Sequence, residues 1–237
     1  MQGESTYQKK HEELVQALFE TETFETYREN ATHVKVGIVP RFLGCILVTT
    51  GNLFYGSKPS YGKFKALEIV ARIPYQSWEV ATYMLLTFFF SDEQKAIRLS
   101  ESSYFSRVAQ DNETMHVVLM ADLARKYREG WFWLHTAIPV LFSLLYSVSI
   151  FLLFLFHRRS AYELNYLFES HAFDQYQCFL DMEGARLKLA PVQSAFLEFY
   201  GRHVKNEYEL FLSIRNDELV HRNQSITERD RKLIANR

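Results

Sequence analysis

The 237-residue sequence has few cysteines and almost no net charge. Its two cysteines, Cys45 and Cys178, are too few for a disulfide-stapled fold or for a four-cysteine zinc or iron–sulfur site. The formal net charge of −1 provides no basic field, so no nucleic-acid partner is expected. No secretory signal is expected either, because residues 1–30 are polar and acidic.

The sequence also lacks the alternation of apolar and polar residues that marks β-strands, and it has no Asn-Gly hairpin turn. Hydrophobic residues make up 48% of the chain, enough for one large core. The predicted fold class is therefore all-α. We expect a polar N-terminal arm at residues 1–32, a single domain at 33–225 and a loose, charged C-terminal tail at 226–237. The arm is interpreted as a solvated extension in preference to a specific binding arm.

Within this domain, four segments have helical composition. The first contains Pro74, which should kink or reset the helix. The last contains Gly201, near which we expect a break. These helices are predicted at residues 61–90, 101–128, 160–182 and 192–224.

The most hydrophobic run comprises residues 131–156, which contain no Asp, Glu, Lys or Arg. These 26 residues exceed the roughly 20 that span a bilayer. Arg158 and Arg159 follow shortly, as interfacial anchors do. Both a transmembrane helix and a helix lying along one leaflet fit this run. Residues 34–56 are apolar but interrupted by glycine, proline and charge, which favours an interfacial element.

Two of the eight histidines have a glutamate three residues earlier, in the pairs Glu113–His116 and Glu218–His221. Residues i and i+3 of a helix share one face, so each pair can hold one metal ion. Taken alone, such a short motif is weak, because glutamate is common in the chain.

The order of the carboxylates strengthens this interpretation. Di-iron helical bundles take one Glu from each of two helices and a Glu-x-x-His pair from each of the other two. Here the order is Glu, Glu-x-x-His, Glu, Glu-x-x-His, with gaps of 45, 56 and 49 residues between the glutamates that start each unit. Carboxylate and imidazole ligands suit iron or manganese. The predicted ligands are Glu68, Glu113, His116, Glu169, Glu218 and His221.

Three further residues lie close to these ligands in the sequence. Tyr176 follows Glu169 by two helical turns on the same face, so it is either an electron or proton donor to the metals or an ordinary core tyrosine. Asn112 and Asp217 each precede a Glu-x-x-His pair. They are expected either to orient the ligands from behind or to lie on a solvated surface.

Four motifs along residues 61–225 resemble the alternative oxidases, which are membrane-bound di-iron quinol oxidases. The motifs are LEIVARIPY, AQDNETMHVVLM, ESHAFDQY and IRNDELVH. They are most similar to the plastid terminal oxidase branch. The resemblance implies six long helices: a ferritin-like four-helix di-iron bundle plus two membrane-associated helices. It favours monotopic attachment through residues 34–56 and 131–156 over a true span.

The resemblance also implies an activity. A quinol:oxygen oxidoreductase of this type oxidises plastoquinol or ubiquinol and reduces O2 to water without pumping protons. It would hold two Fe ions, contact membrane lipid and form a possible homodimer. Tyr176 matches the redox-active tyrosine of the family, and Asn112 and Asp217 match residues that support its ligands. The expected location is a bacterial inner membrane or a thylakoid-type membrane, and the plastid thylakoid if the source is eukaryotic.

Quinone contacts are expected at Lys63 and Arg72, with the head group between the helices that carry Glu68 and Glu113. Lys63 stands where the family usually has an arginine, five residues before the first ligand, and it keeps the charge without the planar fork. Two other functions stay open. One is a related di-iron enzyme that hydroxylates a quinone precursor, and the other is a non-catalytic membrane interaction protein.

Overall fold

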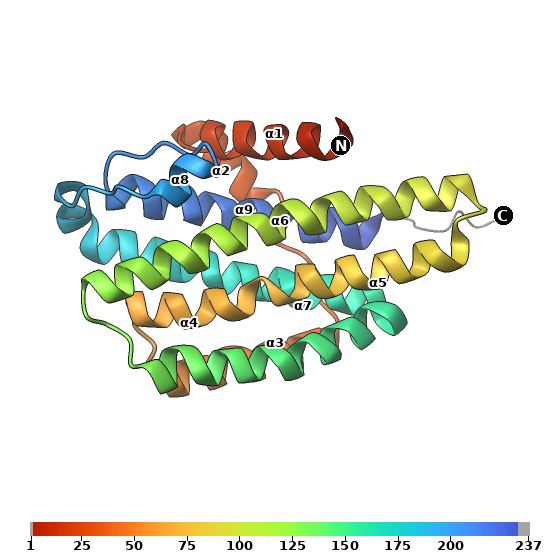
Figure 1. The fold of residues 1–237 in the computed structure, drawn as a ribbon, viewed down its shortest axis with the longest axis horizontal. Helices are drawn as coiled ribbons and strands as arrows, with labels where there is room; N and C mark the ends of the chain where they lie inside the picture. The colour runs from red at the N-terminus through yellow and green to blue at the C-terminus, as the bar shows by residue number, and fades with distance from the viewer. Residues whose placement is uncertain (1, 232–237) are drawn as a thin grey trace.

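The structure is a computed structural model that describes residues 2–231, and it consists of long helices laid nearly side by side (Figure 1). No β-strand occurs among these residues, so the prediction of an all-α fold is confirmed. The elements are α1 Gln2–Ala17, α2 Thr21–Glu29, α3 Ile38–Tyr55, α4 Tyr61–Ala71, α5 Ile73–Phe89, α6 Glu93–Lys126, the π-helical turn η1 Trp133–Ala137, α7 Ile138–Leu189, α8 Ala195–Phe199 and α9 Glu207–Asp230.

Four rods pack into a bundle: α4 with α5, then α6, the second half of α7, and α9. The first rod is broken at Arg72, because Pro74 sits in the first turn of α5 and cannot continue the hydrogen bonding of α4. The expected interruption at Pro74 is therefore present. The second rod, α6, begins at Glu93, eight residues before the predicted start at residue 101. Asp92 caps this end by accepting a hydrogen bond from the backbone N–H of Lys95.

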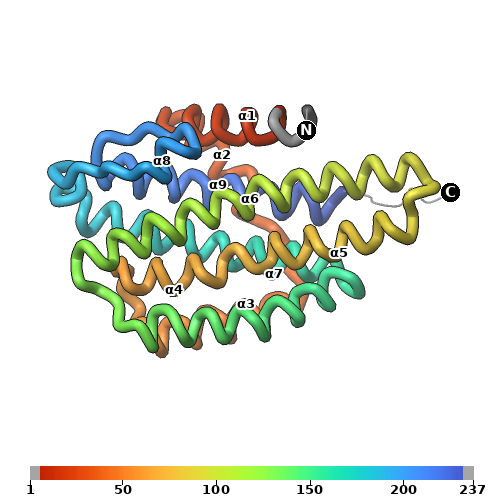
Figure 2. Tube along the Cα trace, viewed as in Figure 1, coloured from red at the N-terminus to blue at the C-terminus, as the bar shows by residue number. Residues whose placement is uncertain are grey.

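Helix α7 joins two segments that the sequence suggests as separate helices. The backbone leaves helical geometry at His157 (φ −142°, ψ 56°), and the helix bends there without ending. Its first half lies outside the bundle, beside α3, and its second half lies inside (Figure 2). Counting the two halves separately, the described chain has six long rods, as expected.

At the C-terminal end the expected break near Gly201 is present, because α8 ends at Phe199, Gly201 adopts φ +69°, and α9 begins at Glu207. The expected boundary of the tail needs correction. Helix α9 then runs to Asp230, so residues 226–230 are not a loose tail. Glu228 is fully buried there. Residues 232–237 of the predicted tail lie outside the described residues.

The N-terminal arm is also different from the expected solvated extension. Its two helices place Val15, Leu18 and Phe24 in a buried cluster with Phe173 and Leu219. Because an apolar face of α1 and α2 packs on α7 and α9, the prediction of a solvated extension is wrong. The polar composition of the arm belongs to its outer face.

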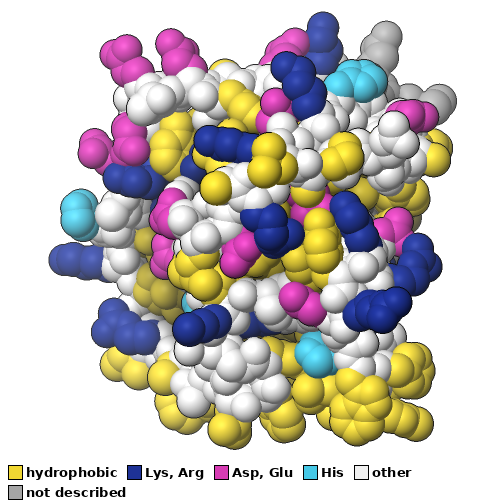
Figure 3. Space-filling model, turned by 90° about the vertical axis from the view of Figure 1, so that its left-hand side faces the viewer, with side chains coloured by type: hydrophobic (Ala, Val, Ile, Leu, Met, Phe, Trp, Pro, Cys, Tyr) yellow, Lys and Arg dark blue, Asp and Glu magenta, His cyan; other side chains and the backbone are white. Residues whose placement is uncertain are grey.

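An apolar edge runs along one side of the bundle, formed by α3 and residues 138–156 of α7 (lower edge in Figure 1). By length and composition, α3 and the η1–α7 helix are apolar enough to cross a membrane. Figure 3 shows hydrophobic side chains gathered along this edge and charged side chains above it. The exposed apolar side chains of the edge include Ile38, Phe42, Leu53, Leu141, Leu144, Leu145 and Phe156.

Candidate metal centre

The four rods of the bundle bring the six predicted ligands together in its interior. Helix α4 carries one of them, α6 two, α7 one and α9 two. Each Glu-x-x-His pair lies on the inward face of its helix, as the i, i+3 spacing predicts. All six side chains are at most 3% exposed: Glu68, Glu113, His116, Glu169, Glu218 and His221.

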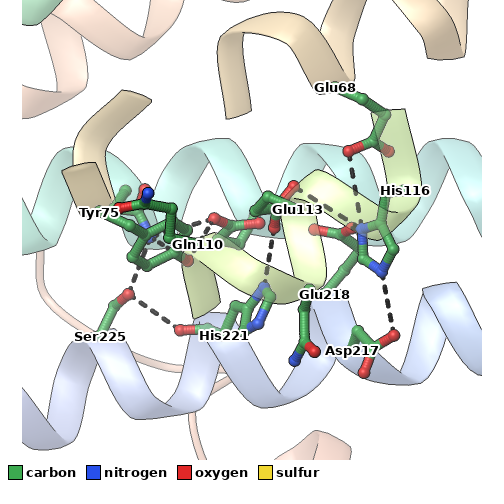
Figure 4. A network of polar contacts seen from close by, with 12 residues as sticks. Glu68, Tyr75, Gln110, Glu113, His116, Asp217, Glu218, His221 and Ser225 are labelled. Atoms are coloured by element: carbon green, nitrogen blue, oxygen red, sulfur yellow. Dashed lines mark hydrogen bonds and ion pairs between the residues drawn. The ribbon is translucent and has the colours of Figure 1, made fainter. Parts of the chain in front are cut away.

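These side chains form two groups that share two members. Ligand atoms of Glu68, Glu113, His116 and Glu218 lie within 4.8 Å of one another, and so do those of Glu113, Glu169, Glu218 and His221. Glu113 and Glu218 belong to both groups and lie between the two histidines in Figure 4. Each group therefore has one histidine and one carboxylate of its own, plus two shared carboxylates. The six residues therefore offer donor atoms for two metal ions, with Glu113 and Glu218 available to both.

Both imidazoles direct the same nitrogen at the carboxylates. His116 Nδ1 lies 3.2 Å from Glu218 Oε1 and 3.6 Å from Glu68 Oε2. His221 Nδ1 lies 2.9 Å from Glu113 Oε1. On the far side of its ring, His116 Nε2 donates a hydrogen bond to Asp217 at 3.0 Å. This bond leaves the Nδ1 lone pair free to face a metal ion.

The hydrogen bonding of the site fits a bound metal pair. Buried polar atoms are nearly always hydrogen-bonded, and an orphaned atom needs an explanation. Within the described chain, the inward-facing atoms of all six ligands have no hydrogen-bond partner, although oppositely charged groups lie near them. The orphaned atoms include both carboxylate oxygens of Glu113 and Glu218, the shared residues. Oxygen and nitrogen donors of this kind suit iron or manganese.

The pKa values of these carboxylates are driven apart. Burial raises the pKa of Glu68 to about 7, with repulsion from Glu113 adding to it. Burial and repulsion from Glu113 also raise the pKa of Glu169. Burial and repulsion from Glu113 and Glu169 raise the pKa of Glu218 well above its usual range. Burial opposes ionisation of Glu113 too, but contacts with His116 and His221 lower its pKa to about 2. Cations are needed for all four carboxylates to be charged together.

Asp217 lies directly behind His116, where the sequence places it. Despite burial, the Arg202 guanidinium holds the pKa of Asp217 well below its usual range, so the carboxylate is charged. Arg202 donates to both oxygens of Asp217 and is itself fully enclosed. Asn112 is buried nearby, and its side-chain amide contacts His11. Neither Asn112 nor Asp217 lies on a solvated surface.

Two tyrosines flank the site, and the sequence analysis identified only one of them. The Tyr176 hydroxyl donates a short hydrogen bond to Glu68, which belongs to one metal group. The Tyr75 hydroxyl donates to Glu169 Oε1 at 2.7 Å, in the other group, and receives a bond from Asn165. Tyr75 lies seven residues after Glu68. This spacing could have revealed it, but Pro74 breaks the helix in between and hides the shared face.

The two residues expected at the quinone occupy different environments. Lys63 is buried, and its Nζ donates to Asn52 Oδ1, to Gly56 O and to Ser57 O, so it holds the loop between α3 and α4. Among the described residues, Lys63 is absent from the walls of the groove at Arg72 and of the two cavities on the α4–α7 side. Arg72 lies at the break between α4 and α5 and lines a groove of 520 Å³ against the first half of α7.

A second groove leads from the apolar edge toward the ligands. It occupies 140 Å³ between α3, α4 and α7, and Leu67 and Phe168 are in its wall. The same two residues also line a narrow crevice that reaches Glu68 and Tyr176. The crevice lies between α4 and α7, whereas the sequence analysis expects the quinol head group between α4 and α6.

The sequence is similar to known proteins of one family. The family model for alternative oxidase matches residues 11–230. A curated relative, ubiquinol oxidase 4, chloroplastic/chromoplastic, of Arabidopsis thaliana, is 24% identical over 182 residues. The alignment covers 68% of this chain and 49% of the relative, so the chain spans about half the length of that curated protein. No solved structure matches the chain.

Proposed function

The chain belongs to the alternative oxidase family, and we propose that it is a di-iron quinol:oxygen oxidoreductase that reduces O2 to water without pumping protons. Family membership was predicted from four motifs, and the family match extends across all of them. The observation that carries the proposal is the pair of buried Glu/His groups sharing Glu113 and Glu218. Plastoquinol or ubiquinol is the proposed electron donor.

Six residues of the chain would hold the irons: Glu68, Glu113, His116, Glu169, Glu218 and His221. Two irons held there would supply electrons for the reduction of O2. The protein keeps this chemistry away from water, since all six side chains are buried, and presents open ligand atoms on facing helices. Asp217 holds the His116 ring in the tautomer that ligation requires.

Tyr176 is the residue of the chain placed to exchange an electron and a proton with the site. Its hydroxyl donates to Glu68, and its ring stacks on Phe64 with centroids 4.2 Å apart. Burial and the Glu68 carboxylate raise its pKa well above 10, so the phenol stays protonated at neutral pH. We propose that Tyr176 gives one electron toward the reduction of O2 and its hydroxyl proton to the Glu68 carboxylate, and that a quinol afterwards restores both.

The groove between α3, α4 and α7 and the neighbouring crevice share Leu67 and Phe168 in their walls, and they support quinol entry from the apolar edge. An isoprenoid tail avoids water at about 0.8 kcal/mol per CH2 group, so it would remain against the groove between α3, α4 and α7. The head group would approach the crevice at Leu67 and Phe168, which leads to Glu68 and Tyr176. Arg72 would be the cationic group of the 520 Å³ groove against the first half of α7. Lys63 would contribute indirectly, by holding the α3–α4 loop beside the groove in place.

The arrangement of the apolar edge favours monotopic attachment. Helix α3 and the first half of α7 lie alongside the bundle and do not project from it (Figure 1). A bilayer crossed by these helices would also enclose the charged side chains of the neighbouring rods, at a cost of several kcal/mol each. Insertion of the edge into one leaflet leaves those side chains in water (Figure 3). The possible homodimer stays a prediction.

The test is oxygen uptake by the purified, detergent-solubilised protein with iron quantified in the same sample. Decyl-plastoquinol and decyl-ubiquinol are supplied in turn, with cyanide present. Two irons per chain and cyanide-resistant uptake, with two quinols oxidised per O2, are expected. Bound iron together with a hydroxylated product would show that the protein is a quinone-precursor hydroxylase and would overturn the proposal. Iron-free, inactive protein would support a non-catalytic membrane protein.

A further inference from the structure

The N-terminal helix α1 places two polar residues against the back of the metal centre. His11 is 6% exposed, although it belongs to a segment with a strongly polar sequence. The neighbouring Glu12 meets Arg202, which is 2% exposed. The chain positions are 206 residues apart for His11 and Asp217, so no local pattern connects them. Nothing in the proposed reaction uses either residue directly.

His11 contacts the residues that stand behind the ligands. Its Nε2 lies 3.0 Å from Asp217 Oδ1 and 2.6 Å from the side-chain amide of Asn112. Its ring lies beside that of His221, with centroids 5.6 Å apart. From the same helix, Glu12 accepts hydrogen bonds from Arg202 at 2.9 and 3.1 Å.

These contacts determine how Asp217 is held. Its Oδ2 atom accepts from His116 and from Arg202, while its Oδ1 atom accepts from His11 and from Arg202. Glu12 in turn fixes the guanidinium of Arg202. Without α1, the carboxylate of Asp217 would keep a single protein donor on Oδ1 and would be freer to rotate. The His116 ring would then lose part of its fixed orientation.

We propose that His11 is a positioning residue of the metal centre and that α1 must be docked for the centre to hold iron with full affinity. Docking alone does not need a histidine here, because Val15 and Leu18 already bury the apolar face of the helix. The polar contacts of His11 are instead with Asp217, which orients the ligand His116. This inference rests on the proposed di-iron function.

The experiment measures Fe(II) affinity of the full chain under anaerobic conditions by competition with a chelator. Residues that support metal ligands typically contribute 10- to 100-fold in affinity. His11 acts one step further out, so His11→Phe should weaken iron binding by about tenfold. His11→Gln, whose amide can reach Asp217, should stay within about threefold of the wild type. The EPR signal of the mixed-valence centre should shift in His11→Phe and not in His11→Gln.

A matched control separates positioning from docking. Val15→Ala removes apolar contact from the same helix without touching Asp217, and it should retain both iron affinity and the EPR signal. Equal losses in His11→Phe and Val15→Ala would overturn the positioning role of His11, because weaker docking of α1 would then explain both losses. Wild-type affinity in His11→Phe would overturn it outright.

A third variant is used if circular dichroism shows that His11→Phe folds poorly. His11→Asn then takes its place, because the shorter amide does not reach Asp217 and the same tenfold loss is expected. Wild-type affinity in His11→Asn would overturn the inference. A wild-type protein that binds no iron would instead be a failure of the proposed function, and it would be seen before any variant is compared.

Discussion

Replacing Glu68 with glutamine should stabilise the metal-free protein while it disrupts iron binding. Glu68 is fully buried beside Glu113, and without a metal its ionised form is unfavourable. Glutamine has the same shape and carries no charge. Its amide oxygen can accept the hydrogen bond from Tyr176, and its amide nitrogen can donate to His116 Nδ1. The variant therefore removes an electrostatic cost without opening a cavity.

The magnitude follows from the pKa of the carboxyl group. Folding raises the pKa of Glu68 from 4.5 to about 7. Each pKa unit corresponds to about 1.4 kcal/mol, so ionisation costs the fold about 3 kcal/mol. A raised acid pKa leaves stability intact below pH 4.5, where both states bind the proton. That stability is lost as the pH rises through 7. The gain from glutamine should be nearly absent at pH 4.5 and complete above about pH 8.

The assay is thermal unfolding in the presence of EDTA at several pH values. For a chain of this size, about 3 kcal/mol corresponds to a rise in Tm of roughly 6–12 °C at pH 8. The control is Glu198→Gln, an exposed position where less than about 0.5 kcal/mol is expected. With iron present the order should reverse, because the wild type gains binding energy that the variant lacks. A metal-free Glu68→Gln protein no more stable than the wild type at pH 8 would refute the reasoning.

Three further outcomes are expected. Tyr176→Phe should keep its iron and lower oxygen uptake by roughly a hundredfold, the size of a positioned proton donor; full uptake would dismiss Tyr176. Tyr75→Phe should lower the free energy of unfolding of the iron-loaded protein by about 1.5–3 kcal/mol, measured with denaturant, because Glu169 loses a donor; an unchanged value would contradict this. Leu53→Glu with Leu145→Glu should reduce vesicle binding in flotation by at least about a hundredfold; undiminished binding would rule out the apolar edge as the membrane contact.

Much of the fold was predictable because its signals are local. Helical composition, the proline at position 74 and the uncharged run at 131–156 can each be recognised within one continuous stretch of chain. The Glu-x-x-His spacing places two side chains on one helix face wherever that helix lies. This spacing accounts for Glu113, His116, Glu218 and His221, and the order of the carboxylates along the chain added Glu68 and Glu169 to the predicted cluster. Their role as ligands stays a prediction that iron analysis will decide.

The contacts that support this cluster were decided by the tertiary structure. His11 reaches Asp217 across 206 residues, and Tyr75 reaches Glu169 across 94, distances over which no periodic pattern extends. The polar composition of α1 predicted solvent on all sides, but one apolar stripe was enough to bury the helix. Lys63 was expected at the quinone, but its ammonium group donates to carbonyl oxygens of the α3–α4 loop. Sequence alone determined the all-α class and the inward faces that carry the Glu-x-x-His pairs, because both depend on local spacing. Packing decided which face of α1 is buried and which residues stand behind the ligands.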